Sequence, residues 1–238
     1  MDHTIPGILA EKLAQFGLTR QEANIYLCLL QNKDLSGYEV SKITGISRSN
    51  VYSALASLVE EGAAYLLEGE TNKYTAVTIE EFCENRIRHL TELKQELAAQ
   101  IPQIGDHSEG YITIASHRHI MDKIYHMLEH VEYRVYLSMP PEYLEQFRPH
   151  LEQLAADGKK VVILTSDLPP ARIKGSTVYQ TDKKDRQLRL IVDSSYVLTG
   201  EMTGSVTDSC LYCGQKNFVD VFKDSLRNEI KLIQLRNC

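Results

Sequence analysis

Apolar residues recur every three or four positions through much of the first hundred residues, a spacing that places side chains on one face of a helix. A Ser or Thr followed three residues later by Glu can satisfy free backbone N–H groups reciprocally and marks a helix start. Such pairs begin at Thr19, Ser36 and Thr78. A further helix is expected from Ser47, with the Ser47 side chain as its N-cap, and Gly62 is expected to end it. The pattern therefore predicts four helices between residues 19 and 101.

Between Ala63 and Val77 the apolar spacing becomes typical of strands. Two short apolar runs, residues 65–67 and 74–77, flank the polar segment 68–73. This predicts a β-hairpin with a polar tip that follows the helix starting at Ser47. A short helix, a turn at Gly45, a longer helix and then a hairpin are the layout of a winged helix-turn-helix, in which the second helix enters the major groove.

The helix expected from Thr78 has an apolar stripe that little in its own domain would cover. The stripe consists of Phe82, Cys83, Ile87, Leu90, Leu93, Leu97 and Ile101, and Pro102 ends the helix. A partner helix is the natural cover for such a stripe. We therefore expect a homodimer that forms through Ile87, Leu90, Leu97 and Ile101.

Strands and helices alternate after the polar segment 103–110, which is expected to be a linker. The predicted strands are 111–115, 133–138, 160–165, 177–180, 188–192, 196–198 and 210–212, and the predicted helices are 117–130, 142–156 and 217–233. Alternation of this kind predicts an α/β sheet. The chain is thus expected to be an α+β multidomain protein with a DNA-binding domain (1–77), a dimerisation coiled-coil helix (78–102) and an α/β domain (110–238).

Composition limits the possible functions of this chain. A length of 238 residues favours two domains, and the five cysteines are expected to be reduced thiols rather than a disulfide framework. No signal-peptide pattern or membrane-spanning run is present, so a cytoplasmic protein without membrane partners is expected. The net charge of −6 argues against a protein coated in nucleic acid, so any DNA contact must be local.

The residues at the start of the second helix of the helix-turn-helix suit contact with duplex DNA. Arg pairs with guanine edges or phosphate, Asn pairs with adenine, and hydroxyl groups bond to phosphate. The candidates are Ser47, Arg48, Ser49, Asn50 and Tyr52, with Lys73 on the wing tip. Simpler explanations remain open, since Ser and Asn cap helices and hairpin tips carry Lys for solubility.

The segments 17–23, 26–27 and 46–55 (GLTRQEA, YL and ISRSNVYSAL) resemble the TrmB-like family of transcriptional regulators. The resemblance is specific up to about Val77 and extends to the rest of the chain only in layout. It implies a winged helix, a coiled-coil dimerisation helix and a C-terminal domain of phospholipase D-like fold. In that family the C-terminal domain binds a small-molecule effector, often a sugar, and the DNA partner is a double-stranded operator.

Phospholipase D enzymes carry a His-x-Lys-x4-Asp pattern followed by a Gly-Ser, in which His attacks phosphorus and Lys neutralises phosphoryl charge. Alignment on Asp193 and Gly200 puts Arg186 at the His position, Leu188 at the Lys position and Glu201 at the Ser position. Neither Arg186 at the His position nor Leu188 at the Lys position supports the reaction. We therefore expect a domain without catalytic activity, with a phospholipase D-type phosphodiesterase as the alternative and an architectural DNA-binding protein as a third, less economical one.

The degenerate cleft is the expected effector site. Its candidate residues are Arg186, Asp193 and Glu201, with Ser138 and Ser166 in the strand-end loops 138–141 and 166–170. Asp193 has an equally good explanation as a turn residue.

No cofactor or metal is expected. The pair Cys210 and Cys213 has metal-ligand spacing but no second pair nearby, so buried thiols are the better interpretation. His117 and His119, two residues apart on a helix, do not share a face. The charge run 182–186 is expected to be a solvated loop.

Overall fold

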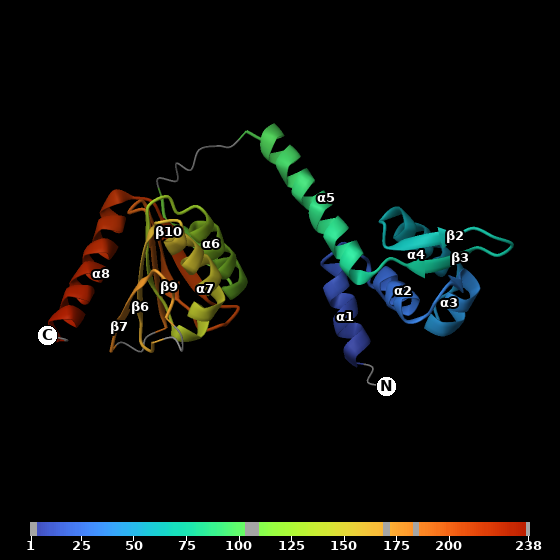
Figure 1. Cartoon of the computed structure of the whole chain (residues 1–238), viewed down its shortest axis with the longest axis horizontal. Coiled ribbons are helices and arrows are strands. Elements are labelled where there is room, and N and C mark those ends of the chain that lie inside the picture. The colour runs from blue at the N-terminus through green and yellow to red at the C-terminus, as the bar shows by residue number, and fades with distance from the viewer. Residues whose placement is uncertain (1–3, 103–109, 169–171, 183–185, 237–238) are drawn as a thin grey trace. The chain divides into compact units, whose positions relative to one another are not determined.

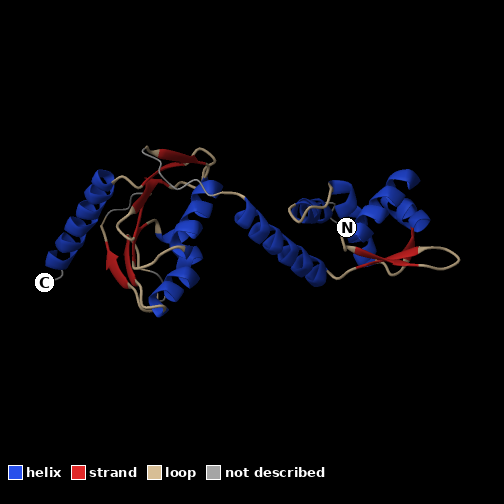
Figure 2. Cartoon of the chain, turned by 90° about the horizontal axis from the view of Figure 1, so that it is seen from above, coloured by secondary structure: helices blue, strands red, loops and turns tan. Residues whose placement is uncertain are grey.

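The computed structural model describes residues 4–102, 110–168, 172–182 and 186–236. The chain forms two compact units, Met1–Ile104 and Gly105–Cys238. Each unit has its own hydrophobic core. The predicted α+β multidomain architecture is confirmed (Figures 1 and 2).

The first unit contains five helices and a three-stranded sheet among its described residues. They are α1 (Thr4–Ala14), α2 (Arg20–Gln31), β1 (Leu35–Ser36), α3 (Gly37–Thr44), α4 (Arg48–Glu60), β2 (Ala64–Leu67), β3 (Lys73–Ala76) and α5 (Ile79–Gln100). The antiparallel sheet has the order β1-β3-β2. Helix α1 and strand β1 were not predicted from the sequence, whereas the other elements were.

Local sequence explains the helix ends of this unit. Thr19 and Ser36 form complete capping boxes with Glu22 and Glu39. The third predicted box is incomplete, because Thr78 accepts from the Glu81 N–H but the Glu81 carboxylate accepts from Tyr65 Oη at 2.9 Å instead. Gly45 ends α3 with a φ of 72°, a conformation that glycine adopts at no steric cost.

The second unit is a seven-stranded mixed sheet between helices. Its elements are β4 (Ile112–Ala115), α6 (His117–Glu129), β5 (Arg134–Ser138), α7 (Pro141–Ala156), β6 (Lys160–Thr165), β7 (Thr177–Gln180), β8 (Gln187–Val192), β9 (Tyr196–Glu201), β10 (Ser209–Cys213) and α8 (Lys216–Arg236). The strand order is β4-β10-β9-β8-β5-β6-β7, with β5, β6 and β7 parallel.

Helices cover both faces of this sheet (Figure 1). On one face α6 and α7 bury the main core, which includes Phe147, Leu137 and Leu190. On the other face α8 packs Leu226 and Ile233 on a smaller cluster with Leu164 and Ile191. Alternate residues of one strand, such as Leu190 and Ile191, therefore belong to different cores.

Candidate functional site

Apart from Lys73, the predicted DNA-contacting residues lie at the start of α4 and are exposed. Ser47, Arg48, Ser49, Asn50 and Tyr52 are all exposed. Ser47 precedes the helix, but its side chain makes no capping bond, so that part of the prediction is wrong. Its hydroxyl lies 3.4 Å from the Ser49 hydroxyl instead. Both hydroxyls are thus at the surface rather than bonded to the helix backbone.

Arg48 lies over an aromatic ring that the sequence analysis missed. Its guanidinium carbon is 4.4 Å from the centre of the Tyr38 ring. Tyr38 belongs to α3, and 51% of it is exposed. A cation held over an aromatic face keeps a defined direction, because part of its conformational freedom is already lost. Tyr38 lies two residues after the Ser36 cap, in the first turn of α3, and this position was the one sequence feature that could have pointed to it.

Tyr52 packs against the start of α3. A side-chain carbon at Gly37 would lie 2.5 Å from the Tyr52 ring, so only glycine permits this contact. Nearly half of Tyr52 remains exposed. The Gly37 contact, together with the bond from Gln21 Nε2 to the Asn50 carbonyl at 3.1 Å, fixes α4 against α2 and α3.

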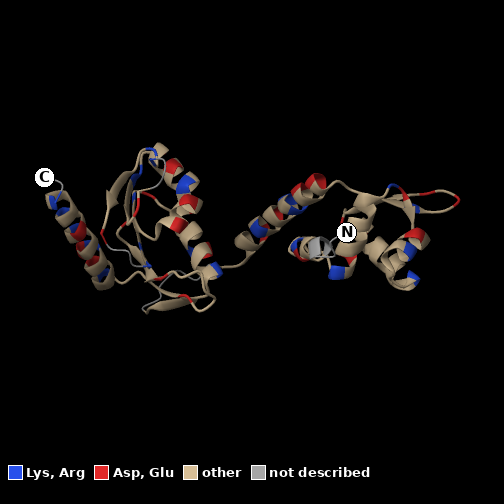
Figure 3. Ribbon diagram, turned by 90° about the horizontal axis from the view of Figure 1, so that it is seen from below, with Lys and Arg blue, Asp and Glu red and all other residues tan. Residues whose placement is uncertain are grey.

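Lys73 is the first residue of β3 rather than a residue of the wing tip, and it pairs with Leu67 and Ser36 across the sheet. It lies near Glu39, whose pKa is lowered by hydrogen bonds from Ser36 and by the Lys73 charge. The tip itself, residues 68–72, carries Glu68 and Glu70, which are exposed (Figure 3). The hairpin therefore carries one cation at its base and two anions at its tip.

Helix α5 is anchored through its first turns to the core of the first unit. Phe82 is buried, and Arg86 Nε donates to the Phe16 carbonyl at 2.8 Å. A side chain at Gly17, where φ is 98°, would meet the Arg86 guanidinium. Beyond this anchor the apolar stripe is open, with exposed fractions of 55% for Ile87, 51% for Leu90, 46% for Leu97 and 60% for Ile101.

The predicted effector residues lie at separate places in the second unit. Arg186 precedes β8, whereas Asp193 follows its last residue, Val192. The Asp193 carboxylate accepts three backbone N–H groups, those of Glu132, Tyr133 and Arg134, each at 2.8 Å. With a φ of 50°, Asp193 has the turn role that the sequence left open, and its oxygens are not directed at a cleft with Arg186.

Arg186 and Glu201 lie at the same end of neighbouring strands, β8 and β9, but on opposite faces of the sheet. The Arg186 carbonyl accepts from the Met202 N–H, and Gln187 stands opposite Glu201. Side chains alternate along strands, so Arg186 lies on the face of Met202 and α7, and Glu201 on the face of α8. The neighbouring Leu188 is fully buried in the core.

Ser138 belongs to a buried polar network beneath α8. Arg189 donates to Ser138 Oγ at 3.0 Å and to Glu229 Oε2 at 2.8 Å, and Thr181 donates to Glu229 Oε1 at 2.9 Å. Arg189 Nε is buried without a hydrogen-bond partner among the described residues. Because a buried charge pair needs such partners, this network fixes α8 to the sheet. No sequence pattern indicated that Arg189 and Glu229 would meet across 40 residues.

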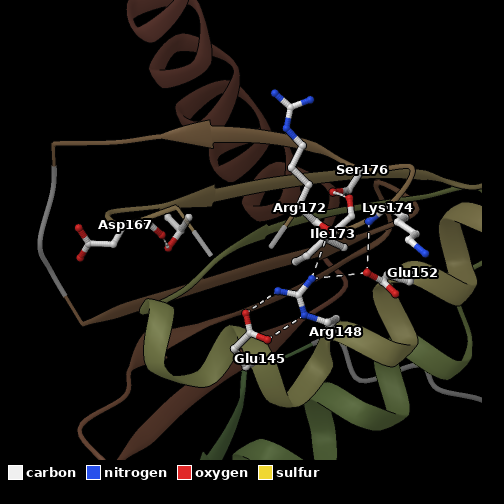
Figure 4. A network of polar contacts seen from close by, with 9 residues as sticks. Glu145, Arg148, Glu152, Asp167, Arg172, Ile173, Lys174 and Ser176 are labelled. Carbon is white, nitrogen blue, oxygen red and sulfur yellow. Dashed lines mark hydrogen bonds and ion pairs between the residues drawn. The ribbon is translucent and has the colours of Figure 1, made fainter. Parts of the chain in front are cut away.

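Ser166 follows β6 in a loop whose described part is well bonded. Gln180 Nε2 donates to the Ser166 carbonyl at 3.1 Å, and Thr165 Oγ1 donates to the Asp167 carbonyl. Figure 4 shows Arg148 of α7 joining Glu145, Glu152 and the Arg172 carbonyl, which holds the return of this loop to β7. Residues 169 and 170 of the predicted strand-end loop, and 183–185 of the charge run, lie outside the described residues.

A second polar group that the sequence did not predict lies at the same end of the strands as Arg186. Buried Asp208 accepts from the N–H groups of Thr203 and Gly204, from Thr203 Oγ1 at 2.5 Å, and lies 3.3 Å from His117 Nδ1. Burial raises the pKa of Asp208, but these hydrogen bonds outweigh it and leave the pKa below its usual value. The His117 ring packs on the Tyr143 ring. Burial, followed by the charges of Glu142 and Asp208, raises the pKa of Tyr143, and the Arg186 charge partly opposes this rise.

Cys210 and Cys213 are free, buried thiols, in agreement with the core interpretation. Burial raises the pKa of Cys210 to about 12, so it is a thiol at neutral pH. Within the described part of the chain, no group of three or more His, Cys, Asp or Glu side chains could hold a metal ion. Nor does any helix in that part have the length and apolar character needed to cross a membrane.

Two family models match the chain. One, described as "Sugar-specific transcriptional regulator TrmB", matches residues 13–80. The other, the N-terminal subdomain of the effector-binding domain of the transcriptional regulator TrmB, matches residues 110–228. The matched ranges contain the helix-turn-helix with its wing and nearly all of the second unit.

Curated relatives give the same result over shorter stretches. The uncharacterized protein YrhO of Bacillus subtilis is 28% identical over 155 residues, which are 64% of this chain and 56% of YrhO. The HTH-type sugar sensing transcriptional regulator TrmBL1 of Pyrococcus furiosus is 28% identical over 152 residues, 61% of this chain and 44% of TrmBL1. The chain matches only about half the length of each relative.

Solved structures are similar at lower identity. TrmBL2, an archaeal chromatin protein, is 19% identical with a TM-score of 0.46, over 96% of this chain and 99% of its own. NucT from Helicobacter pylori is 12% identical with a TM-score of 0.42, over 51% of this chain and 96% of its own. Nuc from Salmonella typhimurium, a phospholipase D family member, is 10% identical with a TM-score of 0.40, over 51% and 94%. At such scores no function is transferred.

Proposed function

Because this chain belongs to the TrmB family of transcriptional regulators, we propose that it binds double-stranded operator DNA through the start of α4, under the control of a small-molecule effector. The observation that carries the proposal is the exposed row of Tyr38, Arg48 and Tyr52 where α3 meets α4. In a helix-turn-helix this end of the second helix points into the major groove.

The proposed contacts are of two kinds: contacts to phosphate that position the protein on DNA, and contacts to bases that recognise the sequence. Ser47 and Ser49 offer hydroxyl donors to phosphate oxygens, while Arg48 and Asn50 are the side chains suited to base edges. Lys73 adds one phosphate contact from the base of the wing. The chain as a whole carries a net charge of −6, so its general electrostatic attraction to DNA is weak. Discrimination between sequences therefore rests on base contacts more than on general attraction to DNA.

We further propose that the regulator is a homodimer joined through α5. A contiguous row of half-exposed Ile and Leu side chains is costly in water and is typical of an interface. Pairing two α5 stripes would bring two copies of α4 to two half-sites of one operator.

For the effector we propose a non-catalytic site at the carboxyl ends of β5 and β6, on the face of the sheet that carries Arg186, with Ser166 after β6 at the same end. Glu201 lies on the other face and Ser138 is buried beneath α8, so neither is kept as a ligand residue. Asp193 is left out, because three backbone N–H groups already occupy its carboxylate. Tyr143 and His117 lie on the Arg186 side and are added to the candidates. The printed family description makes a sugar the first ligand class to test.

The test uses the full chain. Selection of duplexes from a random pool, followed by titration at fixed salt, should give a preferred sequence bound at least about a thousandfold more tightly than unrelated DNA. Equal affinity for all sequences would contradict a sequence-specific regulator and favour an architectural protein. Hydrolysis of a generic phosphodiester, abolished in Arg186→Ala, would instead restore the enzyme alternative.

A further inference from the structure

A cavity of about 510 Å³ lies between α8 and the sheet. Arg134, Lys160 and Thr177, the first residues of β5, β6 and β7, form one end of it. These strands are parallel, so the cavity opens at their amino ends, whereas Ser138 and Thr165 lie at the carboxyl ends of β5 and β6. Lys223, Arg227 and Lys231 of α8 line the other wall. The cavity is thus separate from the proposed effector site, which lies at the carboxyl ends of the strands.

The cavity is basic in an acidic protein. Five of its lining residues are Lys or Arg, and none of those described is Asp or Glu, although the chain has a net charge of −6. Among the described residues no ion pair joins Arg134, Lys160 or Lys231 to an acidic side chain. Lys223 and Arg227 pair only with Asp220 and Asp224, three residues earlier on the exposed side of α8.

These two pairs do not neutralise the cavity. Ion pairs between exposed side chains three residues apart are weak, so a bound anion can replace them. The Asp193 carboxylate, which neighbours the lining residue Ser194 in sequence, already accepts three backbone N–H groups. Several cations without strong acidic partners therefore line one half-open cavity, an arrangement that attracts an anion.

The floor of the cavity is aromatic and apolar. Tyr136, Val162, Tyr179 and Ile191 line it, and the Tyr179 hydroxyl accepts from Gln234 Nε2 of α8 at 3.2 Å. An apolar floor with a charged rim suits a ligand that has a ring as well as a charge, and the volume is in the range of small-molecule sites. A nucleic-acid backbone would require a longer, open track.

We propose that this cavity binds a phosphate-bearing small molecule, a sugar phosphate, with the phosphate held by Arg134, Lys160 and Lys231 and the ring lying on the tyrosines. Such a ligand would bridge α8 to the first residues of three strands. Any regulatory effect rests on the proposed function of the chain, whereas binding itself does not.

The experiment is calorimetric titration of the full chain with glucose 6-phosphate, inorganic phosphate and glucose. We expect glucose 6-phosphate to bind, inorganic phosphate to bind at least tenfold more weakly, and glucose not to compete with glucose 6-phosphate. Lys160→Gln with Lys231→Gln should weaken glucose 6-phosphate at least tenfold. Both side chains are exposed, so the fold should survive, as a melting curve will show.

The matched control is Arg118→Gln with Lys216→Gln, which removes the same charge from exposed positions outside the cavity and should change affinity less than twofold. Equal losses in both double variants would overturn the proposal, as would absence of binding by both phosphate compounds. Loss of DNA affinity in the cavity variant alone, without ligand binding, would assign the basic wall to nucleic acid and also overturn it. If the wild type binds glucose 6-phosphate but no DNA, only the proposed function fails.

Discussion

Arg48 and Tyr52 lie one helical turn apart on α4, whereas Arg186 and Asp193 lie at opposite ends of β8. Both pairs were predicted to form a site, and both are close in sequence. In a helix, residues four apart share a face, so the motif is a surface as soon as the helix forms. A strand of six residues extends about 20 Å, and its neighbours in space come from distant segments. Proximity in sequence therefore indicates a shared site in the first unit but not in the second.

The largest effect that we expect tests whether the DNA surface needs a second copy. Leu90→Glu with Leu97→Glu places charges in the α5 stripe and should give monomers by light scattering. DNA affinity should fall roughly 100-fold or more, because two half-sites are no longer held together. Gln95→Glu with Ala99→Glu adds the same charge away from the stripe and is the control. A dimer that persists in the stripe variant would place the interface elsewhere.

Substitutions of Asp193 test whether this residue stabilises the fold of the second unit or binds the effector. Asp193→Ala removes the acceptor of three N–H groups and should lower the free energy of unfolding by about 2 to 4 kcal/mol. Asp193→Asn keeps an acceptor and tolerates the positive φ, so its loss should be smaller. Denaturant unfolding measures both. Unchanged stability together with lost effector binding would return Asp193 to the effector site.

Arg48 tests the local surface. Arg48→Ala should weaken operator binding by roughly 1 to 3 kcal/mol without altering the melting temperature. Tyr38→Ala should cause part of this loss, since it removes the ring beneath the guanidinium, whereas Tyr38→Phe should not. Arg88→Ala, which removes the same charge from α5, is the control in mobility-shift titrations. If Arg48→Ala and Arg88→Ala behave alike, Arg48 does not contact DNA.

The smallest effect concerns Asp208, and its sign follows from its lowered pKa. A carboxyl with a lower pKa in the folded state stabilises the protein above its unfolded pKa and loses this contribution as pH falls through the folded value. Asp208→Asn should therefore lower the free energy of unfolding by about 1 kcal/mol at neutral pH and flatten its fall in acid. Unfolding curves of Asp122→Asn, an exposed carboxyl, provide the comparison. An equally steep acid fall in Asp208→Asn would contradict this role.

Sequence reasoning predicted most of the elements whose signals are local, although the Ser47 cap was wrong and the capping box at Thr78 is incomplete. Capping pairs, glycine turns and apolar spacing predicted α2 to α5, the wing and the alternation of the second unit. It missed α1, which lies in a segment whose apolar spacing was not used. The pairing of Arg189 with Glu229, and of Asp208 with His117, depends on strand order and register. No spacing along the chain encodes these contacts, so they required the structure.

The anchorage of α5 has a mechanical consequence. Tyr26 Oη donates to the Val77 carbonyl at 2.8 Å, the Tyr26 ring contacts Phe82, and Arg86 reaches Phe16, so the base of α5 is fixed to the core that also supports α4. A fixed base and about four free turns make the rest of α5 a lever arm roughly 20 Å long. A small change of angle where two such arms meet would turn each recognition helix as a rigid body. The separation of the half-sites that the regulator tolerates would then be set far from the DNA.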